Sequence, residues 1–251
     1  MDEIALFDDF GATAPGRFEL SAAAGVAVHL WAVPLDGDPE PFLAPLSVGE
    51  RERAGRFHFA DHRRRYEITH GALRHVLAGY VGKAPADLEF RLGPKGKPYL
   101  EGDGAPFFSL SHSGKLTLIG VAATELGVDC EKLRRLESYR EIARRHFSAA
   151  EFDGLERLDD QARLLAFYRC WTRKEAYIKA LGEGLTMGLD TFDVSIDEEP
   201  RLCACREGDE QPDAWRMLDV SPGPDFVGAL AMRRAGGGEE VAVRRFRLRL
   251  A

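Results

Sequence analysis

Two neighbouring acidic residues and a third one further along the chain have the chemistry to hold a cation. In the segment GVDCEK (127–132), which follows an apolar run, Asp129 and Glu131 project to one side and Cys130 to the other if the segment is a strand. Two carboxylates that point the same way repel each other unless a metal ion or a shared proton lies between them. Taken alone, a solvated strand end is the simpler interpretation of this pair.

The third carboxylate, Glu175, interrupts the apolar face of the helix expected over residues 161–181. The apolar side chains of that face are spaced three or four apart: Leu164, Phe167, Tyr168, Trp171 and Ile178. A carboxylate on such a face is costly unless it is paired or binds a cation. An ion pair with Lys179, one helical turn further on, and a cation site are equally good interpretations of Glu175 alone.

Considered together, Asp129, Glu131 and Glu175 offer oxygen ligands only. A small set of carboxylates is what Mg²⁺ uses when substrate phosphates and water complete its octahedral shell. A zinc site is disfavoured, because Cys203 and Cys205 form a single C-x-C pair without a second pair.

Two segments have the composition of an anion site. SLSHSGK (109–115) follows an expected strand and brings hydroxyls, a histidine and a lysine to a turn with free backbone N–H groups, although a plain serine-rich turn explains it as well. Residues 50–75 contain seven arginines, four acidic residues and four of the seven histidines, which indicates a phosphate-bearing ligand or a solvated basic helix face. The Walker, nucleophile-elbow and Rossmann glycine motifs do not occur.

Five motifs follow one another in a set order: GKP (96–98), FSLSHSG (108–114), GVDCEK (127–132), FSAAE (147–151) and FYRCWTRKEAYIKALGEGL (167–185). In this order they closely resemble the Sfp-type 4′-phosphopantetheinyl transferase family, and W-x-x-K-E-x-x-x-K in the last motif is the most specific part. Upstream, LSVGERERAGRFHF (46–59) and RRRY (63–66) are similar to the family's segment that contacts a CoA phosphate. The resemblance covers roughly residues 46–195.

The resemblance implies an enzyme that moves the 4′-phosphopantetheine group of coenzyme A to a serine of an apo acyl or peptidyl carrier protein and releases 3′,5′-ADP. It implies three ligands for Mg²⁺, with Mn²⁺ as an alternative: Asp129, Glu131 and Glu175. Two residues would have catalytic roles. Glu175 would take the proton of the carrier serine, and Lys179 would neutralise charge on the phosphoryl oxygens.

The remaining contacts implied by the resemblance are all with coenzyme A. Ser111 and His112 would contact the CoA phosphates, and Lys179 and Lys174 would lie at the pyrophosphate. The 3′-phosphate contacts fall on Arg53 and Arg65, and the adenine contacts on Lys97 and Pro98. Glu50 departs from the pattern, because some relatives carry a lysine there for the 3′-phosphate, and His62 stands where relatives are often acidic.

Two other functions compete with this interpretation. One is a CoA-binding or regulatory protein that transfers nothing, and the other is a different Mg²⁺-dependent phosphotransferase that acts on a small alcohol or a nucleotide. The first is disfavoured because all the acidic positions and Lys179 are present, and the second because no P-loop or kinase motif occurs.

The pattern of expected elements predicts an α/β (α+β) fold of two similar subdomains, each a long helix on a small, mainly antiparallel sheet. We expect helices over 47–81, 137–160 and 161–181, the first with a capping box of Ser47 and Glu50 and the last ending on Gly182. Strands are expected over 26–35, 88–92, 106–111, 116–123, 191–196, 214–220, 226–232 and 241–250. The expected limits are an N-terminal arm (1–25), an N-terminal subdomain (26–123) and a C-terminal subdomain (124–251).

The composition excludes several classes of protein. The chain is 45% hydrophobic and carries a formal net charge of −7, which argues against general nucleic-acid binding. No apolar run reaches the roughly 18 residues that cross a membrane, and MDEIALFDDFG lacks the segments of a signal peptide. With only four cysteines, we expect a cytoplasmic protein, and the resemblance implies a monomer. Its length fits the branch of the family that serves polyketide and nonribosomal peptide carriers, and fatty-acid carriers are an open alternative.

Overall fold

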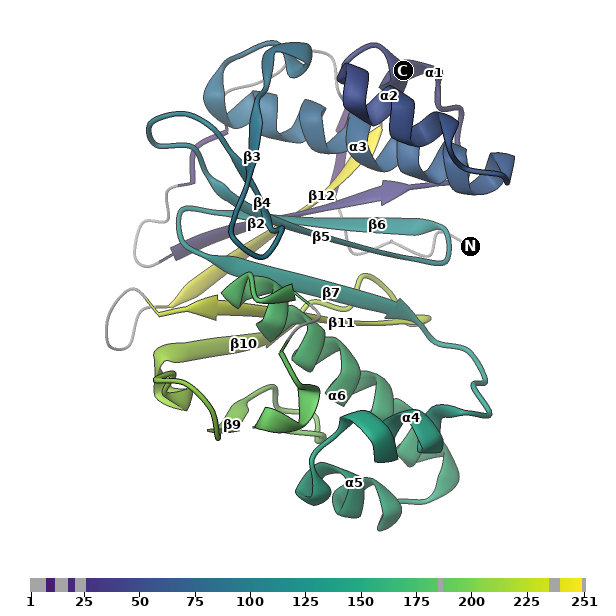
Figure 1. Ribbon diagram of the computed structural model, residues 1–251, viewed down its shortest axis with the longest axis vertical. Helices are drawn as coiled ribbons and strands as arrows, with labels where there is room; N and C mark the ends of the chain where they lie inside the picture. Colours follow the sequence, from purple (N-terminus) through teal and green to yellow (C-terminus); the bar gives the residue numbers. More distant parts are fainter. Residues whose placement is uncertain (1–7, 12–17, 21–25, 185–186, 235–239, 250–251) are drawn as a thin grey trace.

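The chain folds into four layers, helix–sheet–sheet–helix, stacked from top to bottom in Figure 1. The computed structural model describes residues 8–11, 18–20, 26–184, 187–234 and 240–249. The mixed α/β class expected from the sequence is confirmed. No helix in the described part of the chain is both long and apolar enough to span a membrane.

The first sheet has five strands in the order β1-β12-β2-β6-β5. Its members are β1 (Asp8–Gly11), β2 (Val26–Pro34), β5 (Phe107–Ser113), β6 (Leu116–Ala122) and β12 (Val241–Arg249). β1 and β2 run parallel to β12, whereas β2, β6 and β5 pair antiparallel. The second sheet is antiparallel, in the order β10-β11-β7, with β7 (Leu126–Lys132), β10 (Trp215–Asp219) and β11 (Phe226–Arg233).

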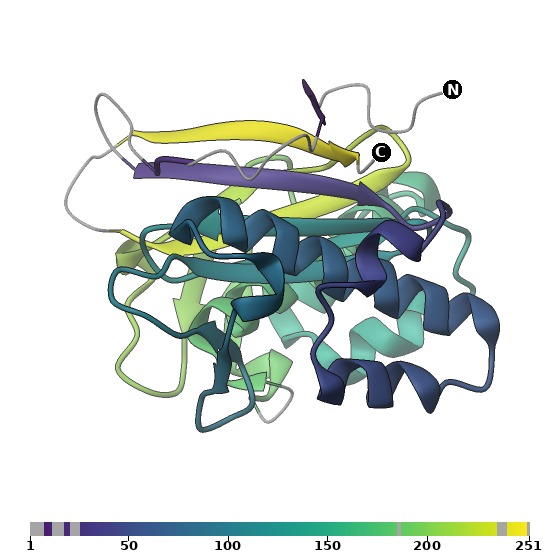
Figure 2. The same cartoon turned by 90° about the horizontal axis from the view of Figure 1, so that it is seen from above.

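Helices cover the two outer faces, and two small hairpins complete the fold (Figures 1 and 2). The helices are α1 (Glu40–Leu43), α2 (Val48–Gly55), α3 (Ala60–Val81), α4 (Tyr139–His146), α5 (Ala149–Glu156) and α6 (Asp160–Leu181). The short 3₁₀ turns are η1 (Pro85–Asp87), η3 (Leu189–Thr191) and η4 (Pro212–Ala214). The hairpins are β3 (Phe90–Leu92) with β4 (Pro98–Leu100), and β8 (Phe192–Val194) with β9 (Leu202–Cys205).

Each expected long helical stretch before α6 is divided into two helices. In the 137–160 stretch, α4 ends at His146 and Ser148 begins a new helix, because its hydroxyl accepts from the Glu151 N–H and the Glu151 carboxylate accepts from the Ser148 N–H. The same capping box joins Ser47 to Glu50 at the start of α2, as the sequence predicted. The final helix also ends as predicted, on Gly182 in the left-handed conformation.

Three apolar cores separate the four layers. One lies between α3 and the first sheet and contains Trp31 and Ile68, and the core around Phe167 and Tyr177 lies between the second sheet and α6. The third lies between the two sheets, where Leu30 and Leu118 meet Val128 and Cys130. Because Cys130 is fully buried there, the expected alternation along β7 is confirmed: Cys130 faces the sheet–sheet core, and Asp129 lies on the other side.

The order of elements repeats at an interval of about 100 residues. A strand, a short capped helix, a 22-residue helix, a small hairpin and two antiparallel strands occur once from β2 to β6 and again from β7 to β11. The repeat extends to individual side chains. Arg74 on α3 bonds Glu50 of the first capping box, and Lys174 on α6 bonds Glu151 of the second.

Strands near both ends of the chain belong to the first sheet. β12 lies at the end of the chain but pairs with β2, so it extends the first sheet and not the second. The arm expected over residues 1–25 lies partly outside the described residues. Within it, residues 8–11 form a strand beside β12, and Phe18 packs edge-on against Trp31 with ring centroids 4.9 Å apart.

A glycine brings the site-bearing strand and helix close together. A Cβ atom added at Gly127 of β7 would lie 2.0 Å from the Ala176 carbonyl oxygen and 2.4 Å from the Ala180 nitrogen of α6. Only glycine therefore permits β7 to approach the backbone of α6 at this level. This contact determines the distance between the acidic residues of β7 and the charged side chains of α6.

Candidate active site

The edge strands β5 and β7 are joined by three serines at alternate positions. Ser109 Oγ accepts a hydrogen bond from Val128 N (3.0 Å), and Ser111 Oγ donates to Asp129 Oδ1 (2.7 Å). Ser113 Oγ donates to Glu131 Oε2 at 2.6 Å. The turn expected over 109–115 begins only after Ser113, because β5 continues to that residue and its backbone pairs with β6. The three serines of β5 bond β7, and two of them hold its carboxylates.

Asp129 lies at the centre of the acidic residues and is 4% exposed. Its Oδ1 accepts from Ser111 and lies 2.7 Å from Lys179 Nζ of α6. Among the described residues, none donates a hydrogen bond to Asp129 Oδ2, although that oxygen is buried. A buried carboxylate oxygen without a donor is an available ligand for a cation.

Glu175 lies on α6 near Asp129 and is half-buried. Burial raises the pKa of the Glu175 carboxyl, and the negative charges of Asp129 and Glu131 raise it further. Burial also raises the pKa of Glu131, with a smaller contribution from Asp129. Carboxylates that raise one another's pKa in this way are stabilised when a cation binds between them.

The carboxylate oxygens of Asp129, Glu131 and Glu175 are the type of ligand that Mg²⁺ prefers. Within the described part of the chain, no three acidic, histidine or cysteine side chains already converge as a metal site. Asp129, Glu131 and Glu175 share one region of the molecule and supply oxygen only, as a hard cation requires.

A cavity of about 390 Å³ opens between the two halves of the chain. Its lining includes Glu175 and Lys179 from α6 and Lys97 and Pro98 from the β3–β4 hairpin. The Lys97 ammonium donates to the carbonyl of Ala180 at the end of α6 (2.9 Å), and burial lowers its pKa to about 8. The stem of Lys97 therefore lines the cavity while its charge caps the helix.

A second cavity, of about 450 Å³, has only basic residues as its charged lining. These residues come from α2, α3 and β5: Arg53, His62, Arg65, His70 and His112. Burial lowers the pKa of His112, and the positive charges of Lys179, Arg65 and His70 add to this effect. Five basic groups around one cavity form an electrostatic site for an anion.

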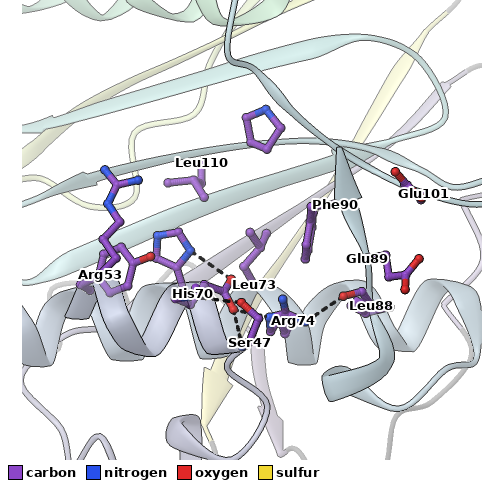
Figure 3. Close-up of a pocket in the computed structure, with 14 residues that line it drawn as sticks. Ser47, Arg53, His70, Leu73, Arg74, Leu88, Glu89, Phe90, Glu101 and Leu110 are labelled. Atoms are coloured by element: carbon purple, nitrogen blue, oxygen red, sulfur yellow. Dashed lines mark hydrogen bonds and ion pairs between the residues drawn. The ribbon is translucent and has the colours of Figure 1, made fainter. Parts of the chain in front are cut away.

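A third cavity, of about 630 Å³, adjoins the other two along α2 and α3 (Figure 3). Glu50 lines it and is engaged on both sides, since its Oε2 accepts from Ser47 N (2.7 Å) and from Arg74 Nε (2.7 Å). These hydrogen bonds and the nearby His70 outweigh burial and lower the pKa of Glu50 to about 2. Glu50, which stands where some relatives carry a lysine, therefore has a structural role: it caps α2 and binds Arg74.

Lys174 does not lie at this site, and its expected contact with the pyrophosphate is wrong. Its side chain is completely buried on the far side of α6, where Nζ lies 2.8 Å from Glu151 Oε1. The same ammonium donates to the carbonyls of Leu189 (2.7 Å) and Phe192 (2.6 Å). Residues 174 and 175 are separated by about 100° around a helix, so only Glu175 of the two faces the cavity.

The chain is similar in sequence to known proteins. A family model described as the 4′-phosphopantetheinyl transferase superfamily matches residues 125–231, which run from β7 to β11. The chain is 37% identical over 218 residues to 4′-phosphopantetheinyl transferase HetI of Nostoc sp. (strain PCC 7120 / SAG 25.82 / UTEX 2576), covering 83% of this chain and 89% of the relative.

The chain belongs to the 4′-phosphopantetheinyl transferase superfamily. It is also similar to 4′-phosphopantetheinyl transferase Sfp of Bacillus subtilis (strain 168), with 28% identity over 77% of this chain and 89% of that one. The structure of holo-[acyl-carrier-protein] synthase (AcpS) from Thermotoga maritima aligns over 44% of this chain and 63% of that one, with 20% identity and a TM-score of 0.34.

Three site features of this superfamily member were missed from the sequence. Ser113 supports Glu131, His70 lines all three cavities, and Lys95 lines the cavity between the halves. Ser113 could have been found from the sequence, because residues 109, 111 and 113 of a strand that reaches Ser113 lie on the same face. His70 lies one turn after the RRRY segment, at the spacing that continues the face of Tyr66.

Proposed function

We propose that this chain transfers the 4′-phosphopantetheine group of coenzyme A to a serine hydroxyl of an apo acyl or peptidyl carrier protein. The proposal rests on the fact that a cavity lined by basic residues adjoins the cavity that contains Glu175 and Lys179. The basic cavity of Arg53, Arg65 and His112 shares His70 and Leu110 with the cavity that ends at Glu175 and Lys179. A ligand with a terminal phosphate and an internal pyrophosphate matches this arrangement.

Coenzyme A would extend from one cavity into the other. Its 3′-phosphate would lie among Arg53, Arg65 and His112, and its adenine along Lys97 and Pro98. Ser111 would not contact the phosphates directly but would hold Asp129 in place, because its hydroxyl donates to the Asp129 carboxylate. The pyrophosphate would then lie near Lys179, which reaches the cavity from α6.

The transfer forms one bond and breaks another at the same phosphorus. The carrier serine oxygen attacks the phosphorus that bears the pantetheine arm, and the bond from this phosphorus to the bridging oxygen breaks, so the electron pair leaves on 3′,5′-ADP. Glu175 would accept the serine proton directly or through water, since a serine hydroxyl does not ionise by itself near neutral pH. The ammonium of Lys179 would stabilise the negative charge on the departing group.

The cation that this proposal requires would be Mg²⁺, with Mn²⁺ as an alternative. Asp129, Glu131 and Glu175 would hold it, and Asp129 Oδ2 is the oxygen without a donor among the described residues. When bound, the cation neutralises negative charge on the pyrophosphate. Ser111 and Ser113 would keep two of the three carboxylates in place through their hydrogen bonds.

The cellular setting belongs to the same proposal. We propose a cytoplasmic monomer with an N-terminal (26–123) and a C-terminal (124–251) subdomain, in which β12 of the C-terminal subdomain pairs with β2 in the first sheet. Its carriers would belong to polyketide or nonribosomal peptide biosynthesis. Light scattering tests the monomer, and the relative activity on fatty-acid, polyketide and peptide carriers tests the pathway.

Intact-mass spectrometry of an apo carrier protein tests the function directly. After incubation with this protein, CoA and Mg²⁺, we expect a gain of one phosphopantetheine that chelator and carrier Ser→Ala both abolish. CoA binding without any gain on several types of carrier would favour the non-catalytic CoA-binding protein. Phosphate transfer to a small alcohol or nucleotide without a carrier would favour the other phosphotransferase.

A further inference from the structure

The loop that joins β3 to β4 connects the two halves of the chain. The two strands form a small sheet of their own, and residues 93–97 between them reach from the N-terminal half to the end of α6 (Figure 1). Lys95 forms an ion pair with Glu183, just after α6, and Lys97 donates to the Ala180 carbonyl at 2.9 Å. Two lysines of one short loop thus tie it to the C-terminal half.

The base of this hairpin is fixed, whereas its tip is not packed into a core. Leu88 and Leu100 at the base are buried in the core under α3, and the Arg74 guanidinium donates to the Leu88 carbonyl at 3.0 Å. Towards the tip, Leu92 and residues 94–96 are exposed. A segment with few buried apolar contacts moves at a low cost in free energy. The tip can therefore move while the base stays in place.

The tip and the chain after α6 meet at the 390 Å³ cavity between the halves. Residues 95–98 line the cavity from the hairpin, and Gly182 and Gly184 line it from the end of α6. A Cβ atom added at Gly184 would lie 3.3 Å from the Lys95 carbonyl oxygen, and one added at Gly182 would lie 3.1 Å from Lys97 Cδ. These distances leave no room for a nucleotide to pass here while the hairpin stays in this position.

The ion pair of Lys95 and Glu183 is suited to a contact that opens and closes. Its side chains are 47% and 36% exposed, so water and salt screen the two charges and the pair contributes little to stability. The pair of Lys174 and Glu151 on the same helix is different, because both side chains are buried and breaking it would leave a charge without a partner. Opening the Lys95–Glu183 pair leaves no buried charge behind.

We propose that the β3–β4 hairpin (residues 90–100) is a strap over the cavity between the halves, that the ion pair of Lys95 and Glu183 fastens it, and that opening of this pair limits how fast coenzyme A enters and leaves. This inference rests on the proposed function, because it assumes that CoA occupies the cavity. Lys97 and Pro98, the residues proposed to lie along the adenine, belong to the same hairpin and line the cavity. Exchange of CoA would then require the tip to move away from residues 182–184.

The rates of CoA binding and release, measured without a carrier protein, test the strap. Stopped-flow mixing with CoA that carries a fluorophore on its thiol gives the association rate, and displacement by an excess of unlabelled CoA gives the dissociation rate. We expect Lys95→Gln and Glu183→Gln each to raise both rates about two- to fivefold, as for the loss of one exposed ion pair that holds the strap closed. The dissociation constant should change little, because the pair is lost from the free and the bound protein alike.

Three further measurements make this test specific. The charge-swapped variant, Lys95→Glu with Glu183→Lys, should restore the wild-type rates, because the pair can form in the reverse sense. Arg140→Gln is the matched control: it removes an ion pair with Glu156 of similar exposure, 50% and 30%, and neither residue lines the cavity between the halves. Hydrogen exchange of the amides of residues 93–97 needs no ligand, and it should be faster in both single variants than in the charge swap.

The outcomes separate this inference from the proposed function. Rates that rise in both single variants and return to the wild-type values in the charge swap support the strap. A weaker affinity in Lys95→Gln, with unchanged rates in Glu183→Gln, would mean that Lys95 binds the ligand directly, and it overturns the strap. Unchanged rates in both single variants also overturn the strap and leave the proposed function standing. If the wild type does not bind CoA at all, both proposals fail.

Discussion

Lys179 Nζ lies 2.7 Å from Asp129 Oδ1 and joins helix α6 to strand β7. The Ser111 hydroxyl donates to the same oxygen, so the other oxygen of Asp129 remains buried without a donor among the described residues. Oδ1 of Asp129 is thus bonded within the protein, whereas Oδ2 is available to a ligand. This difference between the two oxygens determines what substitutions at Asp129 and its neighbours should do.

Asp129→Asn should weaken the metal dependence of transfer. The amide removes one negative charge from the acidic residues and can no longer serve as an anionic ligand, so about tenfold more Mg²⁺ should be needed for half-maximal rate. The measurement is the rate of carrier modification as a function of Mg²⁺ concentration. An unchanged metal titration curve, with a thermal transition like that of the wild type, would remove Asp129 from the proposed ligands.

Glu175→Gln should lower turnover by about 10²–10⁴-fold, as for the loss of a general base. The same change should leave the melting temperature equal or higher, because burial and two nearby carboxylates disfavour the charged form of Glu175. Single-turnover kinetics and calorimetric melting measure the two effects. Glu141→Gln is the control, since Glu141 is exposed on α4. A near-wild-type rate in Glu175→Gln would contradict the assignment.

Lys174→Met should destabilise the protein without acting on CoA. It leaves the Glu151 carboxylate buried without its cation, and we expect a loss of about 3–5 kcal/mol in the free energy of unfolding. Urea unfolding measures this loss, and the KM for CoA of the folded protein should stay unchanged. Lys179→Met is the matched substitution on the same helix, and it should reduce turnover with a smaller loss of stability. A raised KM for CoA in Lys174→Met with normal stability would return Lys174 to the site.

Glu50→Gln should make the protein less stable at neutral pH but not at low pH. Because the pKa of Glu50 is lowered to about 2, its ionised form stabilises the fold above the unfolded-state pKa near 4.5, and this contribution disappears as the pH falls from 4.5 to 2. The difference between wild type and variant should be roughly 3 kcal/mol at pH 7 and should shrink toward zero at pH 2.

Chemical unfolding across this pH range measures the Glu50 contribution. Glu52→Gln, an exposed position on the same helix, is the control and should show no such dependence. A constant difference between wild type and Glu50→Gln from pH 7 to pH 2 would mean that the charge of Glu50 contributes nothing to stability.

Local sequence was sufficient for several helices and strands and for the sides of those elements on which the acidic residues lie. Alternation in GVDCEK placed Asp129 and Cys130 on opposite faces of a strand, and the spacing of apolar residues placed Glu175 on a helix. The Ser47 and Glu50 pattern predicted a capping box that the structure contains. These features follow from interactions within a few residues of one another, which the sequence displays directly.

Only the tertiary structure decided which neighbour of a functional residue faces the site. Lys174 and Glu175 are adjacent, and either could have faced the cavity until Gly127 brought β7 against one side of α6 and Glu151 met Lys174 on another. The position of β12 beside β2 was equally hidden, because a strand's own pattern does not name its partner. Helix and strand periods determine which residues share a face, whereas long-range packing determines whether that face meets a core, a buried partner or a ligand.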